Sequence, residues 1–114
     1  MGLLDFFGLN KKEDPDEATL KRLKSTGSDL SKPHNIGFYL YFPSQFAAEK
    51  AAIRIKKSGF HTSIINSKKG DWLCLATKKM VPELSAFRNF RTEFGHLFQT
   101  FGGKYDGWGT EAEK

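Results

Sequence analysis

Aromatic and basic side chains are the residues of this sequence whose chemistry suits the binding of a partner. Two tyrosines and two tryptophans are candidates for stacking and hydrogen bonding, and two lysines and an aspartate are candidates for ionic contacts. The set is Tyr39, Tyr41, Trp72, Lys68, Lys69, Asp106 and Trp108. Aromatic rings stack on bases or side chains, and lysines bind phosphates or carboxylates. The residue types therefore predict a partner-binding surface.

Catalytic and metal-binding patterns are weak in comparison. The histidines His34, His61 and His96 fall on separate predicted elements without metal-ligand spacing, and Cys74 is the single cysteine. No pair of carboxylates is spaced for acid–base catalysis, and the glycines after position 101 do not form a phosphate loop. We therefore predict that the protein is not an enzyme and that it holds no cofactor and no metal.

Length and composition predict one globular domain. The chain has 114 residues, of which 39% are hydrophobic, and 11 phenylalanines supply material for a core. A single cysteine argues against disulfides and for a reducing, cytoplasmic setting. No stretch approaches the ~20 apolar residues that span a bilayer. We expect a flexible segment over residues 1–14, the domain over 15–111 and a short tail over 112–114.

The basic excess lies in the middle of the chain. The net charge is +5, and residues 34–79 contain eight basic residues against only Glu49 and Asp71. Such an excess favours an anionic partner, either RNA or an acidic protein segment. The alternative is that these lysines are ordinary solvated residues on a helix and a hairpin.

Alternating residues over 34–42 predict the central strand of a sheet. Ile36, Phe38 and Leu40 point to one face and Tyr39 and Tyr41 to the other.

A hairpin over 60–77 is also predicted, with Trp72, Cys74 and Ala76 on one face of its second strand. Tyr39 and Tyr41, together with Trp72 or Cys74, are then expected on the open face of the sheet, where an RNA-recognition motif stacks bases. Burial under an N-terminal helix is the other interpretation of these aromatics.

Three helices complete the pattern. The first begins at Pro15 with Asp14 as its cap, the second follows Ser44 and ends near Gly59, and the third runs from Pro82 to Gly102. The element order after the first helix is βαββαβ. It predicts an α+β protein with a ferredoxin-like fold, in which a four-stranded antiparallel sheet carries two helices on one face. The N-terminal helix is an addition to this plan.

The last strand contains the aromatic and glycine run from 104 to 110. Strict alternation places Lys104, Asp106 and Trp108 on one face and Tyr105 on the other. Buried Trp and Tyr side chains usually make a hydrogen bond with their polar tips, and Asp106 is a ready acceptor for such a bond from Trp108 or Tyr105. We interpret the run first as a strand that locks the fold, and second as a partner-binding edge.

Three segments resemble the RraB family, which is named for a regulator of ribonuclease E activity. They are residues 27–34 (GSDLSKPH), residues 38–43 (FYLYFP) and, above all, residues 105–110 (YDGWGT). The resemblance spans roughly residues 16–111. It implies a ferredoxin-like domain in a bacterial cytoplasmic protein that binds an RNA-decay nuclease of the ribonuclease E type and lowers its activity without catalysis.

The chain departs from this family in its charge. The regulators that gave the family its name are acidic and carry an acidic C-terminal extension, whereas this short chain has a pI of about 9.4. An acidic protein can dock on the basic RNA-binding segments of a nuclease, and a basic protein cannot do so in the same way. The sequence therefore supports two hypotheses, a protein-binding regulator of RNA decay and an RNA-binding module built on the tyrosines and the basic hairpin.

Overall fold

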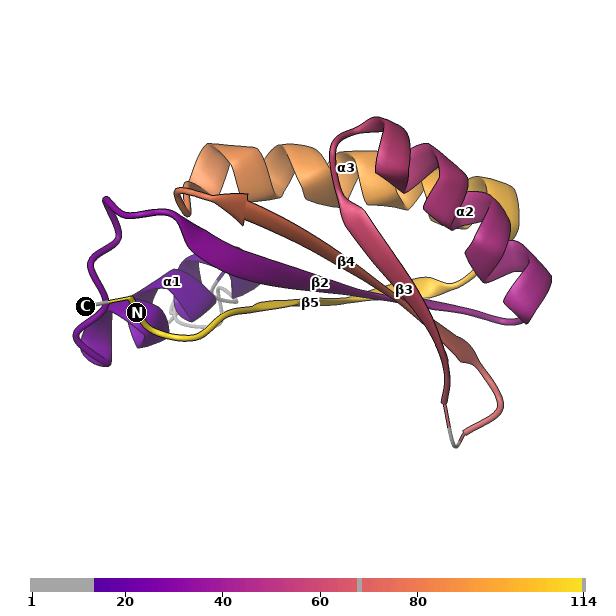
Figure 1. Ribbon diagram of the computed structural model, residues 1–114, viewed down its shortest axis with the longest axis horizontal. Helices are drawn as coiled ribbons and strands as arrows, with labels where there is room; N and C mark the ends of the chain where they lie inside the picture. The colour runs from indigo at the N-terminus through magenta and orange to yellow at the C-terminus, as the bar shows by residue number, and fades with distance from the viewer. Residues whose placement is uncertain (1–13, 68, 114) are drawn as a thin grey trace, which may run out of the picture.

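The computed structural model describes residues 14–67 and 69–113 as three helices and four strands. The helices are α1 (Pro15–Ser25), α2 (Gln45–Lys57) and α3 (Leu84–Phe101). The strands are β2 (His34–Phe42), β3 (His61–Asn66), β4 (Trp72–Met80) and β5 (Lys104–Gly109). The strands form one antiparallel sheet in the order β3-β4-β2-β5. Helices α2 and α3 lie on the same side of it (Figure 1). The predicted α+β class, with a four-stranded antiparallel sheet and an extra N-terminal helix, is confirmed.

Strand β2 supplies the centre of the core. Its exposure alternates along its whole length, and the side chains of Ile36, Phe38 and Leu40 have no exposed surface. The ring of Phe38 contacts those of Phe60 and Phe90 edge-on, with centroids 5.5 and 5.4 Å apart. Edge-to-face contacts of this kind add to the stabilisation from burial. The predicted apolar face of the strand is therefore the face that packs against the helices.

Helix α2 lies on the sheet through its small residues. Ala47, Ala48, Ala51 and Ala52 are all buried, which allows the helix backbone to approach the strands closely. The hydroxyl of Ser44 accepts a hydrogen bond from the backbone N–H of Ala47 at 3.1 Å, so Ser44 is the cap that the sequence predicts.

Helix α3 begins later than predicted and ends where predicted. It starts at Leu84, with Glu83 rather than Pro82 before it, and its first turn has no side-chain cap. At its end, Gly102 has a φ of 77°, a conformation that favours glycine. At Gly103, which also has a positive φ, a Cβ atom would overlap the carbonyl oxygen of Tyr41. The two glycines therefore let the chain turn tightly from α3 into β5.

A β-bulge in β5 overturns the predicted faces of this strand. The register against β2 shifts between Phe38 and Leu40, so that Trp108 lies opposite Phe38 and Tyr105 lies opposite Leu40. Residues directly opposite each other in an antiparallel pair share a face. Tyr105 and Trp108 therefore both point toward the helices, because one extra residue in the strand inverts the alternation after it.

We expect Gly107→Ala to destabilise the protein, because Gly107 lies in this bulge with a φ of 94°. An L-residue in that region costs about 1–2 kcal/mol, and the free energy of unfolding from urea titration should fall by that amount. Gly109→Ala is the control, since Gly109 has no positive φ and a Cβ there meets no neighbouring atom. Its change should stay within about 0.5 kcal/mol. Equal effects of the two substitutions would argue against the bulge.

Candidate functional site

The face of the sheet that points away from α2 and α3, here called the open face, carries apolar side chains from three strands. Tyr41 is paired with Leu73, which is paired in turn with Ile65, and Tyr39 is paired with Leu75. Tyr39 is 37% exposed and Ile65 is 46% exposed. The two tyrosines are on this face as predicted. They lie beside aliphatic side chains, which gives the open face an apolar centre.

Polar side chains rim one end of the open face, next to the turn of the β3–β4 hairpin. They enclose a groove of about 160 Å³, lined by Tyr41, Ser67, Lys69, Asp71, Lys104 and Asp106. Tyr39 lines the neighbouring hollow with Leu75 and Gly109. The fold thus brings three of the predicted site residues, Tyr41, Lys69 and Asp106, to one groove. Lys68 lies outside the described residues.

Trp72 does not lie on the open face, which corrects the prediction. It is paired with Phe42, and its neighbours Cys74 and Ala76 are paired with Leu40 and Phe38. These residues of β4 therefore face the helices, and Trp72 packs partly buried against the core. Strand β4 is apolar on both faces, so its alternation could not indicate which face was open.

Trp108 is a core residue held by α1. It is 7% exposed, and its ring stacks on that of Phe87 with centroids 4.1 Å apart. The indole N–H donates to the carboxylate of Asp16 at 3.2 Å. The predicted acceptor, Asp106, is therefore wrong. The cause is the bulge, which separates Asp106 from the face on which Trp108 lies.

Asp16 also binds Arg91. Asp16, Arg91 and Trp108 thereby join α1, α3 and β5. The guanidinium of Arg91 donates to both carboxylate oxygens of Asp16, at 2.8 and 3.1 Å, and lies 4.9 Å from the ring centroid of Tyr105. The hydrogen bond to Asp16 raises the pKa of Arg91, and burial raises the pKa of Tyr105. We call Asp16, Arg91 and Trp108 the α1 clamp, because they hold α1 against α3 and β5.

A second ion pair supports the start of α1. Arg88 donates two hydrogen bonds to Asp14, at 2.8 and 3.1 Å, and Asp14 also caps the helix by accepting from the backbone N–H of Asp16 at 2.9 Å. The bond from Arg88 holds the pKa of Asp14 below its ordinary value. Asp14 is the cap that the sequence predicts.

Ser28 and His34 form a contact that sequence reasoning missed. The Ser28 hydroxyl lies 2.6 Å from Nε2 of His34, and Nδ1 of His34 donates to the carbonyl of Lys32 at 2.8 Å. A serine paired with an oriented histidine can act as a nucleophile. Here both side chains are buried, and the Ser28 oxygen already accepts the backbone N–H of Glu113 at 2.9 Å. The pair therefore anchors the segment after β5, and its spacing of six residues gave no signal in the sequence.

Cys74 is also enclosed. It is buried, and burial raises the pKa of its thiol to about 11, which keeps the thiol protonated near neutral pH.

Over residues 14–67 and 69–113, no three metal-ligating side chains come close enough to hold an ion. In the same part of the chain, no helix combines the length and the apolar character needed to cross a membrane.

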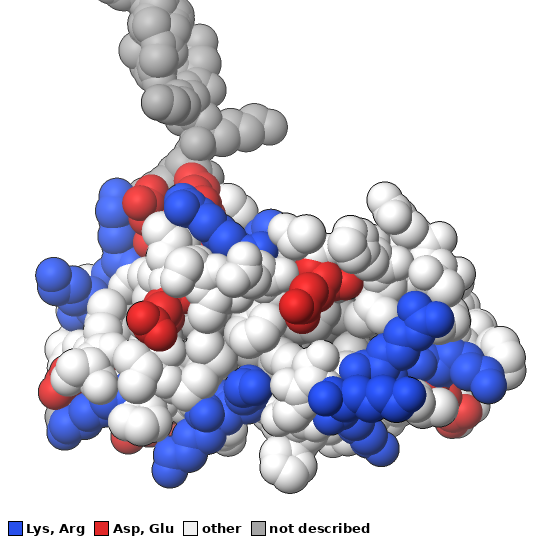
Figure 2. All heavy atoms as spheres, turned by 90° about the horizontal axis from the view of Figure 1, so that it is seen from above, with Lys and Arg blue, Asp and Glu red and all other residues white. Residues whose placement is uncertain are grey.

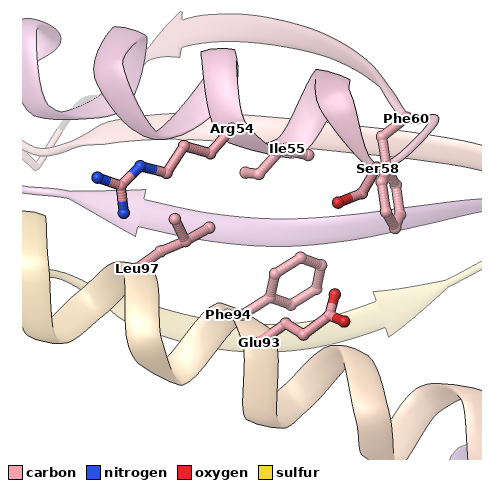
Figure 3. A pocket seen from close by; sticks show the side chains of 7 residues that line it. All are labelled: Arg54, Ile55, Ser58, Phe60, Glu93, Phe94 and Leu97. Atoms are coloured by element: carbon pink, nitrogen blue, oxygen red, sulfur yellow. The ribbon is translucent and has the colours of Figure 1, made fainter.

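A small cleft lies between α2 and α3 (Figure 3). Its volume is about 90 Å³, and its lining residues are Arg54, Ile55, Ser58, Phe60, Glu93, Phe94 and Leu97. Sites for small organic ligands are typically about 300–1,000 Å³. The cleft is thus too small for a cofactor, and the open face is the better candidate for a functional surface.

Comparison with known proteins identifies the family. Residues 13–110 match the family model described as RraB, regulator of ribonuclease activity B. No curated protein sequence matches the chain. The matched segment runs from α1 through the whole sheet and includes the open face and the α1 clamp. The chain therefore belongs to the RraB family of regulators of ribonuclease activity.

Proposed function

We propose that this protein is a non-catalytic cytoplasmic regulator that binds a ribonuclease of the ribonuclease E type through its open face and so modulates RNA decay. The observation that carries the proposal is the convergence of Tyr41, Lys69 and Asp106 on one groove of the open face. Family membership supplies the class of partner.

The composition of the open face supports a protein partner. Its centre is apolar, with Tyr39 and Ile65 among the most exposed large apolar side chains of the described residues. Its rim carries both signs of charge, with Lys69 and Lys104 beside Asp106. An apolar centre with a polar rim is the usual anatomy of a protein interface, and tyrosine is enriched there. In this proposal Trp72 and Trp108 act indirectly, by supporting the strands that carry the surface.

We further propose that residues 15–111 form one ferredoxin-like domain. The order of helices and strands after α1 supports this assignment. So do the central positions in the sheet of β2 and β4, which are its first and third strands in chain order. Such a plan leaves one face of the sheet free for binding, and α1 does not close it, since α1 packs mainly on α3 and β5.

The test replaces the two tyrosines by Tyr39→Thr with Tyr41→Thr. The purified ribonuclease from the same organism cleaves a fluorescent RNA, and the concentration of regulator that changes the rate by half is measured. We expect this concentration to rise at least about tenfold, as for loss of an aromatic hot spot. Val81→Thr is the control, because Val81 is as exposed as Tyr39 and follows the end of β4, outside the paired strands.

A second variant tests the same surface without the risk that the substitution unfolds the protein. Lys69→Glu changes an exposed residue of the hairpin turn, so it should leave the unfolding midpoint unchanged and still weaken the effect on the ribonuclease. If the tyrosine variant and the Lys69 variant both act on the ribonuclease as the original protein does, the open face is not the binding surface.

Single-stranded RNA is the second candidate partner, favoured because Tyr41 lines the same groove as Lys69 and Lys104. Aromatic stacking with flanking lysines suits a single strand. Binding through lysines should weaken steeply as salt rises, and the tyrosine variant should abolish it. An RNA oligonucleotide that is not shifted at low salt by gel electrophoresis would exclude this candidate.

A further inference from the structure

The outer surface of α2 is a second exposed surface, on the opposite side of the sheet from the open face. The two most exposed large apolar side chains among the described residues both lie on it, Phe46 at 68% and Ile53 at 52%. They are seven residues apart, which places them on the same side of the helix, two turns from each other. Isolated exposed apolar residues need no explanation, but these two lie on the same side of one helix, which makes this side a candidate contact surface.

Basic residues follow the same seven-residue spacing. Lys50 and Lys57 lie four residues after Phe46 and Ile53, so apolar and basic side chains alternate along one ridge. The ammonium of Lys50 lies 5.2 Å from the ring centroid of Phe46. We call Phe46, Lys50, Ile53 and Lys57 the α2 ridge. Figure 2 views the molecule from the helix side and shows basic side chains gathered at lower right, where α2 lies.

Helix stability accounts for only part of this pattern. Arg54, Lys56 and Lys57 occupy the last turn of α2, where cations stabilise the negative end of the helix. This effect does not explain Lys50 in the middle of the helix, nor the exposed Phe46 and Ile53. Burial does not explain them either, because the face of α2 that meets the sheet consists of alanines and Ile55.

We propose that the α2 ridge binds an acidic amphipathic helix of a partner protein. A helix lying along α2 presents side chains at intervals of about 10.5 Å per seven residues, which matches the spacing from Phe46 to Ile53 and from Lys50 to Lys57. Apolar residues of the partner would contact Phe46 and Ile53, and its carboxylates would pair with Lys50 and Lys57. The α2 surface carries four basic residues and only Glu49 as an acid, so it selects an acidic partner.

The same charges disfavour other occupants. A second copy of this chain would oppose its own basic ridge to that of α2, and like charges across an interface are repulsive. RNA is bound through its phosphates and its stacked bases, and an exposed isoleucine such as Ile53 at the centre of the ridge favours neither contact. The proposal is independent of the proposed function, since it concerns a different face and a different set of residues.

The test uses a fluorescein-labelled helical peptide of roughly 20 residues, with leucine and glutamate each repeated every seven residues on one face. Its binding to the full chain is measured by fluorescence anisotropy. We expect Phe46→Gln with Ile53→Gln to weaken binding at least about tenfold. Ile65→Gln is the control, because it removes a similarly exposed isoleucine from the open face, and it should change binding less than twofold.

Charge reversal gives the sharper result. The variant with Lys50→Glu and Lys57→Glu should no longer bind the glutamate peptide and should bind a matched lysine peptide. Lys104→Glu should leave the binding of both peptides unchanged. All of these side chains are exposed, so circular dichroism should show a folded protein, with a lower unfolding midpoint where Lys57→Glu places an anion in the last turn of α2. A scrambled peptide that binds equally well would overturn the proposal. Preferential binding of a single-stranded RNA or of phosphatidylserine vesicles through the same residues would do the same.

The ribonuclease assay separates this surface from the open face. Ridge variants that lose the peptide and still regulate the ribonuclease support two independent surfaces. If the open-face variants keep their effect on the ribonuclease while the ridge variants lose the peptide, the proposed function fails and the ridge proposal stands.

Discussion

Trp108→Ala is expected to lower the free energy of unfolding by about 3–5 kcal/mol, the range for deleting a buried tryptophan. The ring is 7% exposed and stacks on Phe87, so its removal leaves a cavity between β5 and α3. It also deprives Asp16 of one of its donors. Urea titration followed by far-ultraviolet circular dichroism would measure the loss.

Trp108→Phe is the matched variant, because it keeps an aromatic ring against Phe87 and removes the N–H group. It should recover more than half of the loss. A loss below about 1 kcal/mol for Trp108→Ala would mean that the ring is a surface contact. Such a result would return Trp108 to the partner-binding set.

Asp16→Ala is expected to lower the free energy of unfolding by about 2–3 kcal/mol. Breaking a buried ion pair costs about 3–5 kcal/mol when the remaining charge stays buried. Here the estimate is lower, because the Arg91 side chain is 39% exposed and water can partly replace the carboxylate. Thermal and urea unfolding should both show the loss. Asp106→Ala is the control, since Asp106 is an exposed aspartate on β5 that is not part of the α1 clamp.

A double-mutant cycle tests the hydrogen bond within the α1 clamp. Asp16→Ala and Trp108→Phe each remove the bond between the indole and the carboxylate, so their effects should not add. We expect a coupling free energy of about 1 kcal/mol, within the range for residues in contact. Additive effects would show that the bond contributes nothing to stability.

Local sequence patterns predicted most of the helices and strands. Alternation over 34–42 gave the bounds of β2, because its buried side is apolar from Ile36 to Phe42, after His34, and its other side is not. Asp14, Ser44 and Gly102 marked helix ends, since caps depend on backbone groups only a few residues away. Such features are local, and a local pattern contains them.

The positions of the candidate site residues were harder to predict. The bulge in β5 depends on pairing with β2, so the faces of Tyr105 and Trp108 cannot be derived from β5 alone. Strand β4 is apolar on both sides, which left Trp72 without a defined face. Asp16 lies in the first turn of α1, where an acidic residue is common for local reasons. Its contact with Trp108 exists only in the folded protein.

The α1 clamp also has a consequence for synthesis on the ribosome. Asp16 and Trp108 are 92 positions apart, and β5 pairs with the central strand β2. Until β5 has left the exit tunnel, one edge of β2 stays unpaired and the buried carboxylate of Asp16 lacks the indole N–H. Stable tertiary structure should therefore form only after β5 is free to pair, and a nascent chain arrested before residue 104 should remain sensitive to proteases.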